Sequence, residues 1–186
     1  MGPFSYVPFM ECNHEIISLF NNLQGNLKID NDKYILDNGI GYIEKDFGVS
    51  FPSKYIWIQA NNFKKNNSCI SLSIATIPFN LINFKGFICI LLVNGKEYRF
   101  ATYNNSKIRE FEVRENKIFV KIKRKDMLLE VLIDRSNGNK LIAPVNGIMN
   151  RKIKESIDSK VNVKLYKSDK LIFEDNSKNG GVEVVS

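Results

Sequence analysis

The sequence is poor in the residues that most often build metal sites and disulfide frameworks. Its 186 residues include one histidine, His14, and three cysteines, at positions 12, 69 and 89. An odd number of cysteines at unrelated spacings predicts no disulfide framework, and one histidine leaves no histidine-rich metal site. We therefore expect no metal, no other cofactor and reduced thiols, which are typical of a cytoplasmic protein.

Long apolar runs and common enzyme signatures are also missing. The longest apolar run, residues 87–93, has the length of a strand; a bilayer-spanning helix needs roughly 20 apolar residues. The first residues show no basic segment followed by an apolar one, so we predict no signal peptide. Phosphate-binding glycine loops, zinc-protease helices and hydrolase nucleophile elbows do not occur.

Positive charge predominates, but it is not concentrated. The net charge is +7, and the lysines are spread along the chain among 20 acidic residues. The one dense basic run, residues 121–125, falls at an expected hairpin tip, where lysines discourage pairing with the strands of other molecules. We therefore predict no specific nucleic-acid partner, whereas peripheral contact with an anionic membrane surface stays open.

Short strand-like segments are abundant, and helical periodicity is nearly absent. Many short strands at turn spacing predict an all-β antiparallel barrel or sandwich, here as a single domain over residues 1–186. The clearest local signal is the Asn94-Gly95 hairpin between two strands, because this dipeptide suits a two-residue turn. Residues 149–165 fit both a helix and a strand, and their valines favour the strand. Other strands are expected as a hairpin at residues 27–36, as a pair between residues 3 and 20, and at residues 69–77, 107–113, 117–123, 127–133, 171–174 and 181–185.

Residues 41–63 hold the most unusual side chains. They fit two strands interrupted at Gly48 and Pro52. The two-residue period gathers polar and aromatic side chains on one face of each strand: Tyr42, Glu44 and Asp46 on the first, and Tyr55, Trp57, Gln59 and Asn61 on the second. Large aromatic side chains usually seek burial, so these faces are expected to line something.

These strands carry a family resemblance. The blocks Gly41-Tyr-Ile-Glu-Lys-Asp-Phe-Gly48, Ser50-Phe-Pro-Ser53 and Trp57-Ile-Gln-Ala-Asn-Asn-Phe63 resemble the signature of the tocopherol cyclase-like family. Residues 2–14, 98–103, 143–147, 155–158 and 180–185 are similar to further family blocks in the same order. The chain resembles the C-terminal portion of longer members. An N-terminal family half supplied by another chain is therefore an open partner.

The resemblance implies a lipocalin-like β-barrel with little helix, holding one hydrophobic small-molecule ligand. It also implies cyclisation of a prenylated quinol to a chromanol, in which an acid protonates an alkene and the phenolic oxygen attacks the resulting cation. Burial raises the pKa of a carboxyl group, so Glu44 or Asp46 is the expected acid. Other expected ligand contacts are aromatic rings that stabilise the cation, Tyr42, Tyr55 and Trp57, and amides that orient the phenol, Gln59 and Asn61 or Asn62.

The two carboxyl groups also have a structural interpretation. Glu44 and Asp46 could instead accept hydrogen bonds from loop amides near Gly48 and Ser50. The residues leave these two interpretations evenly balanced.

Three other polar residues are candidates as well. His14 falls in an expected connection between two strands and is favoured as exposed or locally hydrogen-bonded, whereas the resemblance implies that it faces the ligand. Arg151 and Glu155 share the apolar face of the expected 149–165 strand and are favoured as a structural ion pair over a catalytic role.

Three functions stay open at this point. The first is an isoprenoid-cyclising or hydrating enzyme, an isomerase of the intramolecular lyase type. The second is a lipocalin-like carrier or sensor of a hydrophobic ligand, without chemistry. The third is a structural half that needs a partner chain.

Overall fold

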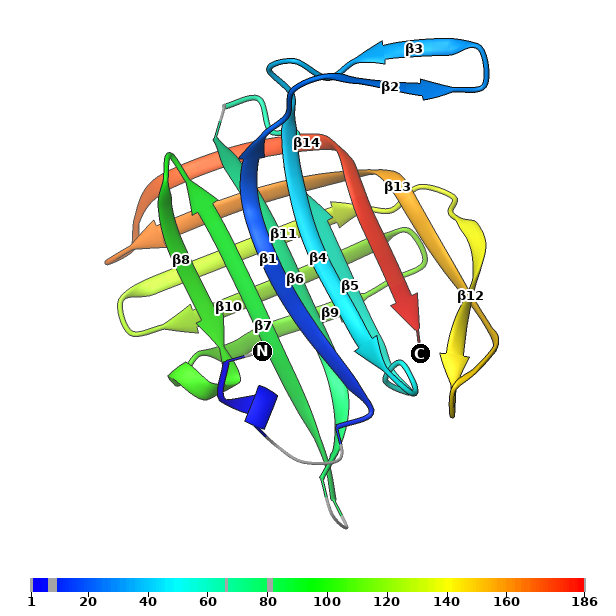
Figure 1. Ribbon diagram of the computed structural model, residues 1–186. Helices are drawn as coiled ribbons and strands as arrows, with labels where there is room; N and C mark the ends of the chain where they lie inside the picture. Colours follow the sequence, from blue (N-terminus) through cyan, green and yellow to red (C-terminus); the bar gives the residue numbers. More distant parts are fainter. Residues whose placement is uncertain (1, 7–9, 66, 80–81, 186) are drawn as a thin grey trace.

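The computed structural model describes residues 2–6, 10–65, 67–79 and 82–185, which are almost entirely antiparallel β-structure (Figure 1). The described helical segments are two 3-10 turns, η1 (Gly2–Tyr6) and η2 (Thr102–Asn104). The strands are β1 (Cys12–Asn22), β2 (Asn26–Ile29), β3 (Asp32–Ile35), β4 (Ile40–Gly48), β5 (Tyr55–Ala60), β6 (Ser68–Phe79), β7 (Ile82–Val93), β8 (Lys96–Ala101), β9 (Lys107–Val113), β10 (Lys117–Arg124), β11 (Met127–Asp134), β12 (Asn139–Val145), β13 (Ile148–Lys167) and β14 (Lys170–Val185). The all-β prediction is confirmed. Neither described helix is long or apolar enough to cross a bilayer.

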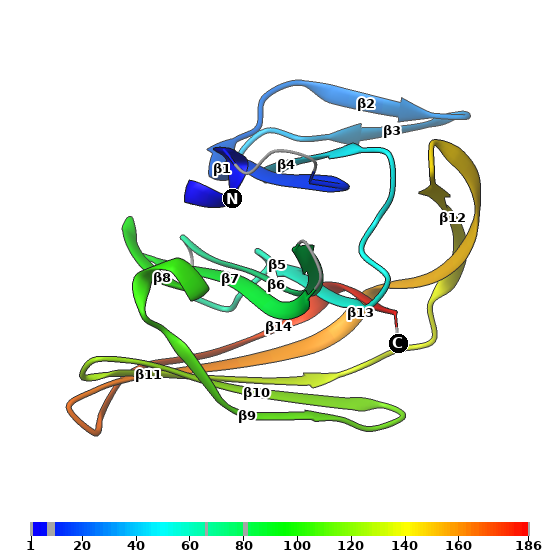
Figure 2. The same ribbon diagram turned by 90° about the horizontal axis from the view of Figure 1, so that it is seen from below.

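One large sheet carries most of the strands. Its order is β8-β7-β6-β5-β14-β13-β11-β10-β9, and β12 pairs with β13 beside this path. β1 and β4 form a separate two-stranded sheet, here called the ribbon, and β2 and β3 form another. In Figure 2 the large sheet curves so that β9–β11 lie beneath β5–β8, while the ribbon lies on the other side of β5–β8.

The hydrophobic core fills the space between the two halves of the curved sheet. Strict alternation builds it, because every second side chain of a strand points to the same side. In β10, for example, Ile118, Val120 and Ile122 are fully buried, and the core continues through β11, β5 and β6. The concave side of the sheet is therefore occupied by packed hydrophobic side chains.

Closure of the sheet into a lipocalin-like barrel is not confirmed. The edge strands are β8, which pairs with β7, and β9, which pairs with β10. In the part of the chain that the structure describes, no ladder joins β8 to β9. The ribbon and the curved sheet form three stacked layers in place of one closed cylinder (Figure 2).

Most strand predictions from the sequence are confirmed, and several details are corrected. The predicted strands at residues 107–113, 117–123 and 127–133 correspond to β9, β10 and β11, and residues 149–165 lie in β13. Where the first of the two strands expected between residues 3 and 20 was placed, residues 2–6 form the 3-10 turn η1, and residues 7–9 lie outside the described residues. His14 lies inside β1 rather than in a connection. β6 continues past Pro78, and the two strands expected at the C-terminus are one strand, β14.

The Asn94-Gly95 turn joins β7 to β8 as predicted, with φ angles of 49° and 77°. Replacing Gly95 by valine should destabilise the protein by about 1–2 kcal/mol, because a side chain with a branched Cβ resists left-handed backbone. A Cβ at Gly95 would meet no atom within 4 Å, so the loss would report backbone strain alone. Urea unfolding of Gly95→Val measures this loss of stability. Gly95→Asn is the control, since asparagine tolerates left-handed backbone. Equal unfolding midpoints of the two variants would contradict the assignment of this turn.

Candidate active site

A cavity of about 180 Å³ lies between the ribbon and the face of β5–β7 that points away from the core. Its walls are mostly apolar, with Phe51, Ile77 and Ile88 among them. Its titratable lining residues include His14, Glu44, Asp46 and Glu183. An apolar cavity with a few convergent polar groups is the usual form of a small-molecule site.

The ribbon supplies three of these groups because its two strands pair in a register that aligns them. His14 stands opposite Asp46, and Ile16 stands opposite Glu44. The register shifts between Ile16 and Ser18, next to these pairs. As the two-residue period predicts, Glu44 points inward while Lys45 is exposed.

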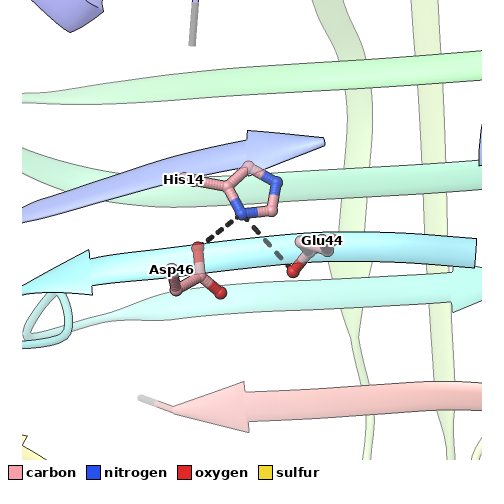
Figure 3. Close-up of side chains that lie close together, drawn as sticks. All are labelled: His14, Glu44 and Asp46. Atoms are coloured by element: carbon pink, nitrogen blue, oxygen red, sulfur yellow. Dashed lines mark hydrogen bonds and ion pairs between the residues drawn. The ribbon is translucent and has the colours of Figure 1, made fainter. Parts of the chain in front are cut away.

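His14 and the two carboxyl groups form one cluster (Figure 3). The Nδ1 atom of His14 lies 2.8 Å from Oδ1 of Asp46 and 3.5 Å from Oε1 of Glu44. The side chains of His14 and Glu44 are only 13% and 11% exposed, whereas that of Asp46 is 31% exposed. Burial disfavours the imidazolium, but the hydrogen bond with Asp46 and the charges of both carboxylates outweigh burial and raise the pKa of His14.

Glu44 is the carboxyl group with the most protein partners in this cavity. The Tyr42 hydroxyl donates to its Oε2 atom, and Trp57 Nε1 donates to the same oxygen at 3.1 Å. Burial is the largest influence and raises the pKa of Glu44, although the charge of His14 and the bonds from Tyr42 and Trp57 act in the opposite direction. A proton on Glu44 therefore persists to a higher pH than on an exposed glutamate.

The partners of the two carboxyl groups bear on their structural interpretation. Glu44 is held by Tyr42, Trp57 and His14, and Asp46 is held by His14. The loop amides near Gly48 behave differently, because Val49 and Ser50 donate their N–H groups to the carbonyl oxygen of Glu11. The described residues therefore do not form the expected hydrogen bonds between these two carboxylates and the loop amides.

Glu183, on the opposite wall, was missed by the sequence analysis. It stands next to Trp57 in the β14–β5 register, and its Oε2 accepts a hydrogen bond of 2.5 Å from the Tyr55 hydroxyl. Burial raises the pKa of Glu183, and the charges of Glu155, Asp46 and Glu44 add to it, although the bond from Tyr55 opposes the rise. Alternation over residues 181–185 could have revealed it, because that period puts Glu183 on the face opposite Val182 and Val184.

The other predicted residues divide between the cavity and its surroundings. Tyr55 and Trp57 line the cavity together with the cluster. Asn61 donates to the carbonyl oxygen of Ile40, and so ties the end of β5 to the start of β4. The remaining predicted amides lie farther off, with Gln59 opposite Ser71 in the β5–β6 register and Asn62 bonded to Asn179 at the surface.

Arg151 and Glu155 do not form the expected ion pair. Arg151 donates to the carbonyl oxygens of Pro52 and Ser53, at 2.8 and 2.5 Å. Glu155 stands opposite Glu183 where β13 pairs with β14. Arg151 therefore anchors the loop at the cavity rim, and Glu155 adds negative charge beside Glu183.

The ribbon cluster also has the residue types of a cation site. One ligand atom from each of His14, Glu44 and Asp46 lies within 4.8 Å of the others. Both carboxyl groups are already engaged by donors of the protein, Glu44 by Tyr42 and Trp57, and Asp46 by His14. This arrangement suits the holding and transfer of a proton without requiring an ion.

Comparison with known proteins gives a family match over the whole chain. The family model described as tocopherol cyclase-like matches residues 1–186. The maize protein "Tocopherol cyclase, chloroplastic" is 32% identical over 74 residues, which are 40% of this chain and 16% of that protein. The "Probable tocopherol cyclase, chloroplastic" of Oryza sativa subsp. japonica is 29% identical over 74 residues, with the same shares. The chain thus covers only 16% of the length of these curated relatives. No solved structure matches it.

Proposed function

The chain belongs to the tocopherol cyclase-like family, and from this premise we propose that its cavity binds the head of an apolar isoprenoid or prenylquinol-type ligand. We propose further that Glu44 promotes cyclisation or hydration of the ligand's alkene by donating a proton. The observation that carries the proposal is the position of Glu44, a carboxyl group 11% exposed in an apolar cavity and raised in pKa by burial.

The acid step uses the proton on Glu44. The O–H bond of the carboxyl group breaks, and the proton adds to the less substituted carbon of the alkene. A tertiary cation is left on the other carbon. In cyclisation a lone pair of the phenolic oxygen forms the new C–O bond, and in hydration a water oxygen does so. A buried acid suits this step because its raised pKa keeps the proton available to a higher pH than on an exposed glutamate.

Glu183, on the opposite wall of the cavity, accepts the second proton to be transferred. After ring closure the phenolic oxygen carries a proton that must leave, and Glu183 is a carboxylate of raised pKa in the same cavity. Its bond from the Tyr55 hydroxyl fixes its orientation. Because Glu44 loses one proton and Glu183 gains one, the protein is reset by exchange with solvent, and the ligand is isomerised without net consumption of acid.

Aromatic rings stabilise the cation between these two groups. Trp57 is held by its bond to Glu44, and its ring lies over Gly181, where an added Cβ would come within 2.9 Å of a ring carbon. The ring therefore sits next to the acid in a fixed place. Positive charge over the face of an indole is favoured by about 0.5–2 kcal/mol.

Ligand binding can be tested by the fluorescence of Trp57, because it is the single tryptophan. Adding a short-chain prenylated quinol analogue should change the emission and raise the melting temperature. Binding to the folded state alone contributes about 2.7 kcal/mol at a ligand concentration 100 times Kd. Trp57→Phe is the control, which should lose the signal and keep a thermal shift. If equilibrium dialysis shows binding while the emission stays constant, Trp57 lies away from the ligand.

A carrier function is the second candidate, and one observation favours it. Glu44 accepts hydrogen bonds from Tyr42 and Trp57 of the protein itself, as a purely structural carboxyl group would. Chromatography of the bound analogue after incubation separates the two functions. Recovery of a chromanol or a tertiary alcohol supports the enzyme. Saturable binding with complete recovery of unchanged analogue across the pH range supports the carrier.

The cysteines suggest the compartment. Cys12, Cys69 and Cys89 are all free. Burial raises the pKa of Cys12 and of Cys69 to about 12, so both persist as unreactive thiols. We propose a reducing compartment, the cytoplasm, for the chain, with ligand exchange at lipid surfaces as described next.

A further inference from the structure

The hairpin of β12 and the start of β13, residues 139–154, extends beside the large sheet and is here called the arm (Figures 1 and 2). A two-residue turn at Asn146 and Gly147, with φ angles of 50° and 79°, joins its strands. β12 pairs with β13 but with no further strand among the described ones. The arm therefore has one edge without a paired strand, and it presents much side-chain surface.

The composition of the arm is unusual for this chain. It carries four basic residues, Lys140, Arg151, Lys152 and Lys154, and no acidic residue, although the whole chain has 20 acidic residues. Three large apolar side chains are mostly exposed, with exposed fractions of 57% for Ile142, 64% for Ile148 and 60% for Met149. Ile142 stands opposite Lys152, and Lys140 opposite Lys154. Ile142 therefore shares one face with Lys140, Lys152 and Lys154, while Ile148 and Met149 lie next to the turn at the tip of the arm.

The arm is anchored to the rim of the cavity. The N–H group of Gly147 donates to the carbonyl oxygen of Val49 at 2.7 Å, and the N–H group of Asn146 donates to Ser50 Oγ at 2.9 Å. The N–H group of Phe51 donates to the carbonyl oxygen of Pro144 at 3.3 Å. Because Phe51 lines the cavity, the tip of the arm and the cavity rim form one continuous surface.

We propose that the arm docks the protein on an anionic lipid bilayer, with Ile148 and Met149 entering the headgroup region and the lysines contacting the anionic lipids. Basic residues next to exposed apolar ones are the combination that favours binding at such an interface. A second copy of the chain fits less well, since pairing two arms would bring four positive charges against four. Nucleic acid fits less well too, because a phosphate backbone offers nothing to exposed isoleucine and methionine. The proposal does not depend on catalysis in the cavity.

Vesicle co-sedimentation tests the docking surface on the whole chain. The protein should bind vesicles of phosphatidylcholine with phosphatidylglycerol, bind phosphatidylcholine vesicles far less, and lose binding as salt is added. The double variant Lys152→Gln/Lys154→Gln should weaken binding about 25-fold, at about fivefold for each lysine near an anionic surface. Ile148→Ser/Met149→Ser should weaken it about tenfold or more, because less apolar area leaves water.

Matched changes elsewhere provide the controls. Lys123→Gln/Lys125→Gln removes the same charge from the β10–β11 turn, and Leu171→Ser/Ile172→Ser removes exposed apolar area from the β13–β14 hairpin. Circular dichroism and melting curves confirm that each variant is folded. Equal losses in the arm and control variants would overturn the proposal in favour of diffuse charge. Absence of vesicle binding overturns it as well. A dimer in sedimentation velocity that only the arm variants dissociate assigns the arm to a second copy.

Discussion

Replacing Glu44 by glutamine is expected to lower turnover of a prenylated quinol by about 10²–10⁴-fold while ligand binding survives, since this is the usual contribution of a general acid. Glutamine has nearly the same shape, and its carbonyl oxygen can still accept from Tyr42 and Trp57, which now bond to Glu44. It cannot donate a proton to an alkene. The loss should therefore appear in kcat, with little change in the analogue's Kd.

The pH profile separates acid catalysis from a structural effect. Glu44 must be protonated to act, so the rate should fall as pH rises through its pKa, which burial places above the ordinary glutamate value. Glu44→Gln should remove this alkaline limb. Asp46→Asn is the matched control, because Asp46 is more exposed and bonds to His14. Full turnover in Glu44→Gln would assign the acid to Asp46, His14 or Glu155.

The two strands of residues 41–63 show how far local pattern reaches. Their two-residue period and the interruption at Gly48 and Pro52 correctly predicted β4 and β5 and which side chains share a face. The pattern could not predict that the two faces meet across a cavity. β4 pairs with β1, while β5 pairs with β6 and β14, and such partners are fixed by tertiary packing of distant segments.

For a related reason, the sequence could not predict whether the sheet closes into a barrel. Alternation indicates that one face of a strand is buried, but it is the same for a closed barrel and for a curved open sheet. Here the concave side is filled by residues such as Ile58, Leu72 and Val131. The candidate site formed instead on the other face of β5–β7, where Trp57 meets the ribbon.

Two missed features had usable signals. Asn146-Gly147 carries the same turn chemistry as Asn94-Gly95, and it joins β12 to β13 in the same way. Pro144, next to that turn, argued against a strand, because proline is confined to edges and bulges. β12 is an edge strand, and its register shifts at Pro144. The sequence therefore carried a signal for the turn of the arm. That β12 is an edge strand became clear only from the order of the strands in the sheet.

Replacing Glu183 by glutamine is the second change with a large expected effect. If Glu183 accepts the phenolic proton, turnover should again fall by about 10²–10⁴-fold. A base must be deprotonated to act, so the rate of the parent protein should fall as pH drops through the pKa of Glu183. Burial and the neighbouring carboxylates place that pKa above the ordinary glutamate value. Glu183→Gln should remove this acidic limb and leave the alkaline limb of Glu44 in place.

The Tyr55→Phe variant gives a second test of the assignment of Glu183 as the base. The Tyr55 hydroxyl donates to Glu183 and thereby lowers its pKa, so the loss of this bond should raise the pKa of Glu183 further. The acidic limb should then move to higher pH, while the rate at higher pH is largely kept. A purely structural bond would instead lower the melting temperature and leave the limb where it was. An unchanged rate and an unchanged limb in Glu183→Gln would leave Asp46 and Glu11 as the carboxylates placed to collect the phenolic proton, because both line the same cavity.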